Sequence, residues 1–334
     1  MSATAPVKAK TINMVQGINM GLADAMRDDD RVFVLGEDVA DREGGGVFGV
    51  TRGLSSEFGE SRVRSTPIAE QAIMGAAIGA AIAGYRPVAE IMLMNFITVA
   101  MDMVVNHAAK LRFMSGGQTN VPIVIRTATG SGVGNGGQHS DMLEAWFAHT
   151  AGMKVVVPSG PAEAAGLMYS SVFDDDPVLF IETIPLYFVN GEAPVPGTRI
   201  PLGKAKLARV GADVTLVAYG RAVNDSLMAA ETLAKEGISA EVLDLRTISP
   251  LDMEAILNSV AKTRRAVVIH EAVTPFGVGA EISSRIHEQL FSDLKAPVQR
   301  VGSNYQPVPF SKPLESDFIY GQSQIIDAVR KITR

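Results

Sequence analysis

Short apolar runs alternate with longer segments of helical periodicity along almost the whole chain, and this alternation restricts the possible folds more than any other feature. Apolar runs without strict polar alternation are typical of strands buried on both faces, as in a parallel sheet covered by helices. We therefore expect an α/β fold with open, doubly wound parallel sheets. In the first half of the chain, strands are expected at 32–35, 86–92, 122–126, 154–157 and 178–182, and helices at 11–27, 70–83, 98–114 and 161–172.

A proline- and glycine-rich stretch, residues 191–201, interrupts this alternation and favours a linker. A chain of 334 residues is also too long for one ordinary core. We therefore predict two domains, residues 1–195 and residues 196–334. Beyond the linker, strands are expected at 214–219, 240–245, 266–270 and 298–301, and helices at 222–236, 251–262, 279–291 and after Gln322.

Composition excludes several classes of function. Hydrophobic residues make up 47% of the chain and charged residues 20%, which is a globular balance, and the net charge of -6 leaves no basic surface for nucleic acid. The absence of cysteine excludes disulfides, thiolate metal sites and cysteine nucleophiles. Residues 1–10 show no targeting segment, and the most apolar helical run, 72–83, falls short of the ~20 residues of a membrane span. We expect a cytoplasmic protein that binds neither nucleic acid nor membrane.

The expected helix at residues 70–83 carries the most information. Pro67 disfavours a helical residue before it, so the helix begins close to Glu70, whose carboxylate the helix dipole then favours. Gly75 and Gly79 lie four residues apart on one face, although each glycine costs ~1 kcal/mol relative to alanine. Close approach of another helix gives a physical reason for them. By itself, the segment describes a tightly packed core helix equally well.

Glu70, Gly75 and Gly79 also match the pattern of the pyrimidine-binding domain in thiamine-diphosphate enzymes. Along nearly its whole length, the chain resembles the beta subunits of the pyruvate, acetoin and branched-chain 2-oxo acid dehydrogenases, which are transketolase-like proteins. The resemblance implies a pyrimidine-binding domain followed by a transketolase C-terminal-like domain. Further motifs that carry it, in the same order, are residues 35–39, 50–54, 84–88, 114–117, 138–140, 244–248, 276–281 and 314–315.

The resemblance assigns roles to several residues. In this family the glutamate at the position of Glu70 hydrogen-bonds the cofactor's aminopyrimidine and so activates the thiazolium carbon. Phe96 matches the ring that stacks on the pyrimidine, Ile68 and Met92 match other cofactor-binding residues, and Glu37 matches an acidic residue near the cofactor. Without the resemblance, an aromatic or methionine after a strand is more often a core residue.

Two further sites follow from the resemblance. His139 matches a family histidine near the active-site mouth, and an imidazole there suits proton transfer to the acyl intermediate or to lipoyl sulfur. The family also binds a potassium ion through main-chain oxygens. The resemblance places these oxygens at Ile123, Ser171, Asp174 and Asp176. The acidic residues of this turn are equally typical of a solvated loop.

The chain lacks the Gly-Asp-Gly sequence with which enzymes of this class hold magnesium and the cofactor's diphosphate. The inference is a separate alpha subunit that supplies both, in an alpha2-beta2 heterotetramer with the cofactor in a cleft between subunits. The resemblance then implies oxidative decarboxylation of a 2-oxo acid and reductive acylation of a lipoyl group. The second domain would contribute to docking on the lipoyl-bearing dihydrolipoamide acyltransferase core.

The sequence leaves alternatives for the substrate and for the class of protein. Residues 113–117 and 95–96 favour pyruvate or acetoin over a branched-chain acid, and pyruvate is the favoured substrate. The glycine-rich stretch 43–48 departs from the family pattern beside the expected pocket. A dinucleotide-dependent dehydrogenase is a rival, because 132–137 satisfies the glycine fingerprint, but the next strand lacks the required acid. A non-catalytic α/β binding subunit is the distant alternative.

Overall fold

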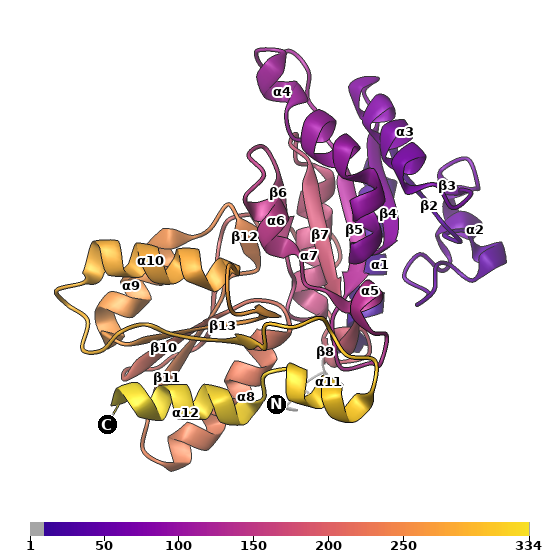
Figure 1. Cartoon of the computed structure of the whole chain (residues 1–334). Helices are drawn as coiled ribbons and strands as arrows, with labels where there is room; N and C mark the ends of the chain where they lie inside the picture. Colours follow the sequence, from indigo (N-terminus) through magenta and orange to yellow (C-terminus); the bar gives the residue numbers. More distant parts are fainter. Residues whose placement is uncertain (1–9, 334) are drawn as a thin grey trace, which may run out of the picture.

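The computed structural model describes residues 10–333 and contains two stacked α/β domains (Figure 1). The prediction that residues 1–10 hold no targeting segment falls outside the described residues, except for Lys10. Between residues 10 and 333, no helix has the length and apolar character needed to cross a bilayer. In chain order, the first-domain elements are β1 (Thr11–Asn13), α1 (Met14–Asp28), β2 (Val32–Gly36), η1 (Asp41–Glu43), α2 (Leu54–Phe58), β3 (Val63–Ser65), α3 (Glu70–Ile82), β4 (Arg86–Leu93), η2 (Met94–Ala100), η3 (Met103–Ala108), α4 (Leu111–Met114), β5 (Val124–Thr129), α5 (Gly137–Ser140), α6 (Glu144–Ala148), β6 (Lys154–Val156), α7 (Pro161–Val172), β7 (Val178–Thr183), η4 (Ile184–Leu186) and β8 (Asn190–Glu192).

The first sheet has the strand order β12-β6-β7-β5-β4-β2-β3, and its neighbours pair in parallel except for β12 with β6. Helices α1 and α7 cover one face, and α3 with the irregular helices η2 and η3 covers the other. Val34 and Val88 pack on the α1 side, whereas Leu35 and Ala89 pack on the α3 side. Because both faces are covered, residues of both parities are apolar, as the sequence predicted.

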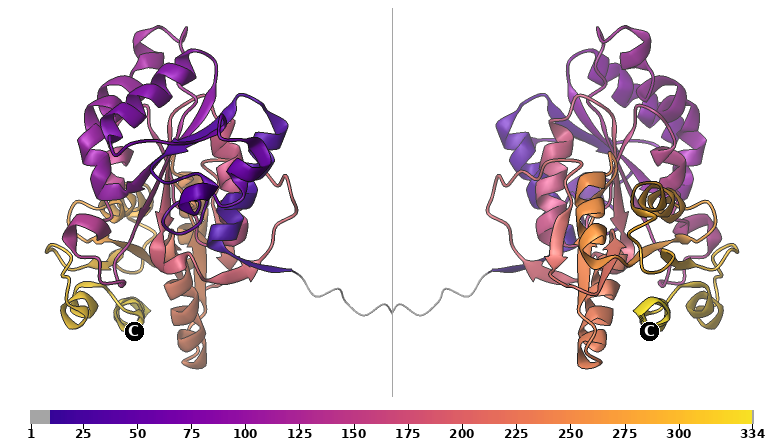
Figure 2. Two further views of the ribbon diagram at one scale, coloured as in Figure 1. Left: turned by 90° about the vertical axis from the view of Figure 1, so that its right-hand side faces the viewer. Right: turned by 90° about the vertical axis from the view of Figure 1, so that its left-hand side faces the viewer.

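The second sheet has the order β14-β13-β10-β11-β9 and is parallel except for its edge strand β9. Helices α9 and α10 lie on one face, and α8 and α12 lie on the other (Figure 1). The side views show the first domain above the second and the C-terminus at the lower end (Figure 2). The second-domain elements are β9 (Lys206–Arg209), β10 (Val214–Ala218), α8 (Arg221–Lys235), β11 (Ala240–Asp244), β12 (Thr247–Ser249), α9 (Met253–Thr263), β13 (Ala266–Val273), α10 (Val278–Leu290), β14 (Gln299–Ser303), α11 (Lys312–Phe318) and α12 (Gln322–Thr333).

The structure corrects two predicted helices. The first begins at Met14 and not at Thr11, because Asn13 forms a capping box with Gln16 and residues 11–13 pair with β8. The helix predicted at 98–114 is divided into the 3-10 helix η2, the π-helix η3 and the short α4. The hydroxyl of Thr98 donates to the main-chain oxygen of Asn95 and so competes with regular helical bonding at its start.

The two domains share a sheet and a core. Strand β12 lies in the second half of the chain but pairs with β6 of the first sheet, an antiparallel addition that the periodicity did not predict. One hydrophobic cluster runs from α3 and the first sheet to α9 and α10 of the second domain. The predicted boundary at residues 195/196 falls between β8 and β9.

Two buried carboxyl groups accept hydrogen bonds across the domain interface. The hydroxyl of Tyr219 donates to Glu144 Oε1 at 2.7 Å, and the hydroxyl of Ser159 donates to Asp244 Oδ2 at 2.5 Å. Burial raises the pKa of Glu144 to about 7 and that of Asp244 to about 7, because a charged carboxylate is poorly solvated there. The interface therefore favours the protonated form of both groups.

The chain is expected to lose thermal stability as the pH rises from about 5 to 8. Because both folded-state pKa values lie above their ordinary values, these two groups bind more protons in the folded protein than in the unfolded chain, and their contribution to stability falls as pH rises. The buried His270, whose pKa is lowered to about 4, acts in the opposite direction, but it is one group against two. The pKa shift of Glu144 alone corresponds to about 3 kcal/mol. Calorimetry at several pH values should show a smaller decline for Glu144→Gln. The matched variant Glu231→Gln, on the exposed side of α8, should keep the wild-type decline; equal slopes for all three proteins would contradict the expectation.

Candidate functional site

The predicted site residues gather at the carboxyl edge of the first sheet. Glu37 follows β2, Met92 lies near the end of β4, Phe96 lies in η2 directly after β4, and His139 lies in α5 beyond β5. These three strands are neighbours in the order β5-β4-β2. Open parallel sheets bind ligands in the crevice outside this edge, so the topology brings residues that are about a hundred positions apart to one place.

Glu70 is the first residue of α3, as predicted. The preceding Ala69 gives no side-chain cap, and the amide of Thr66 donates to the main-chain oxygen of Gly36 at 2.8 Å. This bond ties the loop before α3 to the end of β2, so the helix N-terminus lies beside Glu37. The positive end of the helix dipole favours a carboxylate at this position.

Glu37 and Glu70 form a pair of neighbouring acids. Glu37 is only 7% exposed, whereas Glu70 is half-buried. Burial raises the pKa of Glu37, and the charges of Glu70, Asp38 and Glu90 raise it further. The environment therefore favours the protonated form of Glu37.

Phe96 and His139 meet edge to face, with ring centroids 5.4 Å apart and an interplanar angle of 75°. Asn95 connects their two segments: its Nδ2 donates to the main-chain oxygen of Gly137 at 3.1 Å and to Asp141 Oδ2 at 2.8 Å. In the part of the chain that the structure describes, the buried Nδ1 of His139 has no hydrogen-bond partner. The imidazole is therefore placed by its backbone and by packing.

The two apolar residues predicted for the site differ in exposure. Met92 is half-buried and packs against the core on the α1 side, so it also has the structural role expected without a ligand. Ile68 projects from the loop before α3 and is 81% exposed. An isoleucine so exposed contributes nothing to the core of this chain and is available to a ligand or a second subunit.

Comparison with known proteins decides the family. The model of the transketolase pyrimidine-binding domain matches residues 10–188, and that of the transketolase C-terminal domain matches residues 203–325. The acetoin:2,6-dichlorophenolindophenol oxidoreductase beta subunit of Cupriavidus necator is 44% identical over 331 residues, covering 97% of this chain and 98% of the relative. The pyruvate dehydrogenase E1 beta subunit of Staphylococcus epidermidis is 43% identical, and the 2-oxoisovalerate dehydrogenase beta subunit of Bacillus subtilis is 41% identical; each match covers 96% of this chain and 98% of the relative.

The chain belongs to the transketolase-like beta-subunit family of 2-oxo acid dehydrogenases. The predicted family and two-domain α/β fold are thereby confirmed. Among solved structures, a split-gene transketolase described as an inactive beta4 tetramer is similar, with a TM-score of 0.78 and 23% identity, covering 97% of this chain and 99% of that chain. That similarity supports the fold alone.

The beta subunit contains a buried ion cluster that sequence analysis missed. Arg126 Nη1 donates to Glu90 at 2.5 Å, and Arg126 Nε donates to Glu182 at 2.7 Å. The hydroxyl of Tyr187 also donates to Glu182. The three charged residues lie on the adjacent central strands β4, β5 and β7, and the charge of Glu90 contributes to the raised pKa of Glu37. Charges of opposite sign inside three strands expected to be buried were the available signal.

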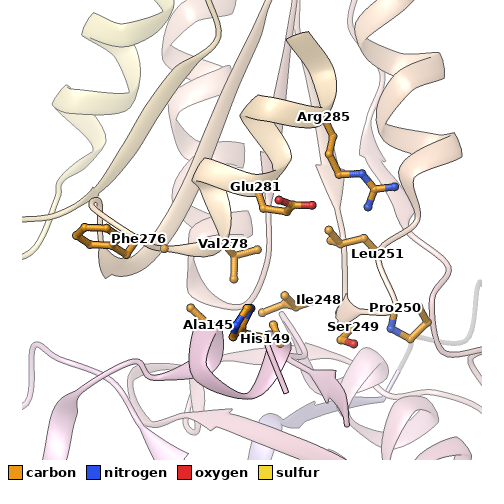
Figure 3. Close-up of a pocket in the computed structure, with 12 residues that line it drawn as sticks. Ala145, His149, Ile248, Ser249, Pro250, Leu251, Phe276, Val278, Glu281 and Arg285 are labelled. Carbon is orange, nitrogen blue, oxygen red and sulfur yellow. The ribbon is translucent and has the colours of Figure 1, made fainter. Parts of the chain in front are cut away.

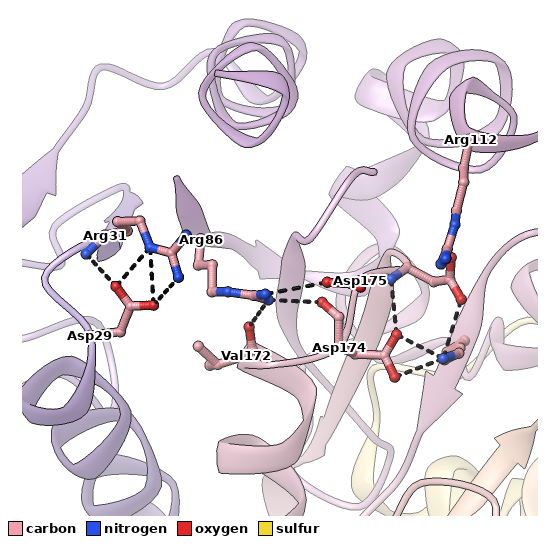
Figure 4. A network of polar contacts seen from close by, with 9 residues as sticks. Asp29, Arg31, Arg86, Arg112, Val172, Asp174 and Asp175 are labelled. Atoms are coloured by element: carbon pink, nitrogen blue, oxygen red, sulfur yellow. Dashed lines mark hydrogen bonds and ion pairs between the residues drawn. The ribbon is translucent and has the colours of Figure 1, made fainter. Parts of the chain in front are cut away.

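The predicted potassium site of this beta subunit lies in a region rich in protein cations (Figure 4). The side chain of Asp174 accepts from Lys154 Nζ at 2.7 Å, and that of Asp176 accepts from Arg112 at 2.5 Å. The main-chain oxygen of Asp174 accepts from Arg86 Nη1 at 3.1 Å. The main-chain oxygens of Ile123 and Ser171 accept backbone amides. Potassium at this turn stays a prediction, and any ion there shares its oxygens with these donors.

The glycine fingerprint at residues 132–137 does not form a phosphate site. The amides of Gly132 and Gly134 donate to Glu315 of the second domain, at 2.7 and 3.0 Å. The helix that follows, α5, has only four residues. Because an internal carboxylate already occupies the amides that would cradle a pyrophosphate, the beta-subunit family assignment and the local geometry agree against a dinucleotide site.

A separate cavity of about 490 Å³ lies between the domains (Figure 3). Glu281 and Arg285 of α10 line one side, and Ala145 with His149 lines the other. None of the predicted site residues lines this cavity. The carboxyl edge of the first sheet therefore remains the candidate active site of the beta subunit.

The residues at this edge fit the pyrimidine of thiamine diphosphate, the cofactor that the family implies. Glu37 supplies a buried carboxyl group with a raised pKa, and Phe96, which lies against His139, supplies an aromatic ring at the same sheet edge. The buried Oγ1 of Thr66 and Nδ1 of His139 have no hydrogen-bond partner within residues 10–333. Such atoms suit a polar heterocycle, because buried polar groups are normally hydrogen-bonded.

Proposed function

We propose that this chain is the beta subunit of the decarboxylating component of a 2-oxo acid dehydrogenase complex. With an alpha subunit it catalyses the thiamine-diphosphate-dependent oxidative decarboxylation of a 2-oxo acid, pyruvate being favoured, and the reductive acylation of a lipoyl group. The observation that carries the proposal is Glu70 at the N-terminus of α3, with the buried acid Glu37 directly after β2, in a chain of this family.

Glu70 is the proposed catalytic acid. Its carboxyl group, at the first position of α3, would share a proton with a ring nitrogen of the pyrimidine. The buried Glu37, whose pKa is raised, would be the second acid of the site. Phe96, Met92 and Ile68 would hold the ring by apolar contact. When bound, thiamine diphosphate supplies the electron sink for decarboxylation, while the protein orients the reactants and moves protons.

His139 is the proposed proton donor or acceptor at the entrance of the active site. Its imidazole lies against Phe96, the proposed pyrimidine-contacting ring, so it is close to where the acyl group would be transferred. A histidine changes charge near neutral pH and can exchange a proton with a lipoyl sulfur. In this proposal the histidine serves the transfer step, and Glu70 serves the activation of the cofactor.

The exposed face of α3 supports an alpha-subunit partner. Among the residues that the structure describes, a Cβ at Gly79 would meet nothing within 4 Å, and one at Gly75 would meet only Met103 Sδ, at 3.7 Å. Neither glycine is therefore needed for packing within this chain, and Ala72 and Ala76 on the same helix are exposed. A helix of another subunit can approach such a face closely. We place the alpha subunit here, in an alpha2-beta2 heterotetramer.

The remaining components follow from the same proposal. The alpha subunit would hold magnesium and the diphosphate, since this chain has no Gly-Asp-Gly sequence. A potassium ion would bind the main-chain oxygens near residues 174–176. The second domain would dock on the lipoyl-bearing acyltransferase core. Acetoin is the second candidate substrate, because two relatives at 44% and 43% identity carry that name, and a branched-chain 2-oxo acid is the third.

The isolated chain is expected to show no thiamine-diphosphate-dependent turnover, whereas the chain coexpressed with its alpha subunit is expected to be active. The physical reason is that, in this proposal, the alpha subunit binds the diphosphate and magnesium, so the isolated chain has an incomplete cofactor site. Steady-state assays with pyruvate, acetoin and branched 2-oxo acids would rank the substrates. The alpha subunit alone is the control. Turnover by the isolated chain, or no cofactor-dependent activity in the assembled complex with any of these substrates, would refute the proposal.

A further inference from the structure

The segment between β5 and α5 is held by two carboxylates of the second domain. Glu271 of β13 accepts from the amide and the hydroxyl of Ser131, at 2.7 and 3.2 Å. Glu315 of α11 accepts from the amides of Gly132 and Gly134. Both carboxylates are almost completely buried, with exposures of 4% and 2%. The contacts place α11 near α5, the short helix that contains His139, as Figure 1 shows.

The backbone of this segment is shaped to present its amides to an anion. Gly132 and Gly134 have φ values of +102° and +78°, which turn their N–H groups toward the same carboxylate. Successive amides in such a conformation form an anion-binding concavity. Phe310 closes the far end, where a Cβ at Gly136 would lie 2.8 Å from its ring. Glu271, Glu315 and Phe310 of the second domain therefore contact residues 131–136. Arg221 of α8 adds a further contact, because its Nη1 donates to the main-chain oxygen of Ser131 at 3.3 Å.

The other end of the same segment is fixed from the first domain. Asn95 bonds Gly137 and Asp141, on both sides of His139. The buried Nδ1 of His139 finds no partner among the residues that the structure describes. The position of the imidazole consequently depends on the hydrogen bonds that hold the backbone at the two ends of residues 131–141. The second domain makes those at one end, and Asn95 makes those at the other.

We propose that Glu315, assisted by Glu271, is a positioning residue through which the second domain places His139 for acyl transfer. This inference rests on the proposed function, in which His139 serves the lipoyl step. It assigns the second domain a role inside the active site in addition to docking. Loss of the carboxylate would release the amides of Gly132 and Gly134, and the histidine would lose its fixed place without any change to Glu70.

The test compares Glu315→Gln, Glu315→Ala and Glu271→Gln in the assembled enzyme with the control Glu288→Gln, an exposed acid of α10. Turnover is measured twice, with a lipoyl domain and with the dye 2,6-dichlorophenolindophenol, which accepts electrons without lipoyl chemistry. A charged buried hydrogen bond is strong, so we expect Glu315→Ala to lower kcat with the lipoyl domain about tenfold or more. Glu315→Gln, which keeps one acceptor, should recover part of the rate, and the dye-linked rate should fall less than about twofold.

Hydrogen exchange supplies a readout that needs no activity. The amides of Gly132 and Gly134 should exchange about tenfold or more faster in Glu315→Ala than in wild type, with global exchange unchanged. Unchanged exchange, an equal loss of both activities, or a full lipoyl-linked rate in Glu315→Ala would overturn the proposal. If the wild-type complex shows no cofactor-dependent turnover, the proposed function fails instead, and accelerated exchange still identifies the grip of the second domain on this segment.

Discussion

Glu70→Gln is expected to lower turnover of the assembled enzyme about 10³-fold or more, whichever substrate proves correct, because glutamine cannot share a proton with the pyrimidine. The fold should persist, since the half-buried Glu70 lies at the first position of α3 and glutamine is a good helix former. Steady-state turnover, with the melting temperature and the elution volume of the complex measured alongside, would separate lost chemistry from lost assembly.

A matched control for Glu70→Gln exists in the same chain. Glu254 is also an acid in the first turn of a helix, α9, and it is exposed. Glu254→Gln removes a comparable charge from a helix N-terminus and should leave turnover unchanged. Near-normal activity of a correctly assembled Glu70→Gln enzyme would contradict the catalytic role, and an equal loss in both variants would indicate a helix-dipole effect.

Arg126→Met is expected to cause the largest loss of stability, on the order of 3–5 kcal/mol, because it leaves Glu90 and Glu182 buried without their cation. All three side chains are at most 10% exposed. Denaturant unfolding of the chain would measure the loss. The triple variant Arg126→Met, Glu90→Gln, Glu182→Gln should recover much of it, since the uncompensated charges are then gone.

The pH dependence of the Arg126→Met loss has a definite sign. Burial already raises the pKa of Glu90, and Arg126 opposes that rise, so removing the arginine raises this pKa further. The folded variant then binds more protons than its unfolded chain, and the loss of stability should be smaller at pH 5 than at pH 8. Arg31→Met, which breaks an exposed pair with Asp29, should change stability little at either pH. A loss that is no larger than this control, or that grows as pH falls, would refute the account of the cluster.

Much of the fold followed from local patterns. Strands β2, β4, β5 and β7 were predicted because each is an apolar run bounded by turn residues, and α3 was predicted to begin at Glu70 because of Pro67. Strand β12 was missed, since three residues carry no periodicity and it pairs with a sheet of the other domain. The irregular helices η2 and η3 were predicted as one helix, because a hydrophobic pattern does not distinguish α from 3-10 or π geometry.

The candidate site, like the fold, contains residues that the sequence pointed to and contacts that it missed. The resemblance pointed to Glu70, Glu37, Phe96 and His139. The structure brings the two rings together, and the charge of Glu70 contributes to the raised pKa of Glu37. The Arg126 cluster was missed because the pairing depends on register between strands. The contact of Glu315 with Gly132 spans 183 residues, so no local pattern contains it. Sequence motifs thus pointed to candidate groups for the chemistry, whereas the contacts that hold these groups in place required the three-dimensional structure.

The central claim is that one carboxyl group of this chain meets a heterocycle whose diphosphate a different polypeptide holds. A crystal structure of the chain with its alpha subunit, thiamine diphosphate and magnesium would test it most directly. We expect the Glu70 carboxyl within hydrogen-bonding distance of a pyrimidine nitrogen, with the diphosphate and magnesium on the alpha subunit. A Glu70 side chain directed away from the pyrimidine, or a diphosphate bound by this chain alone, would contradict the claim.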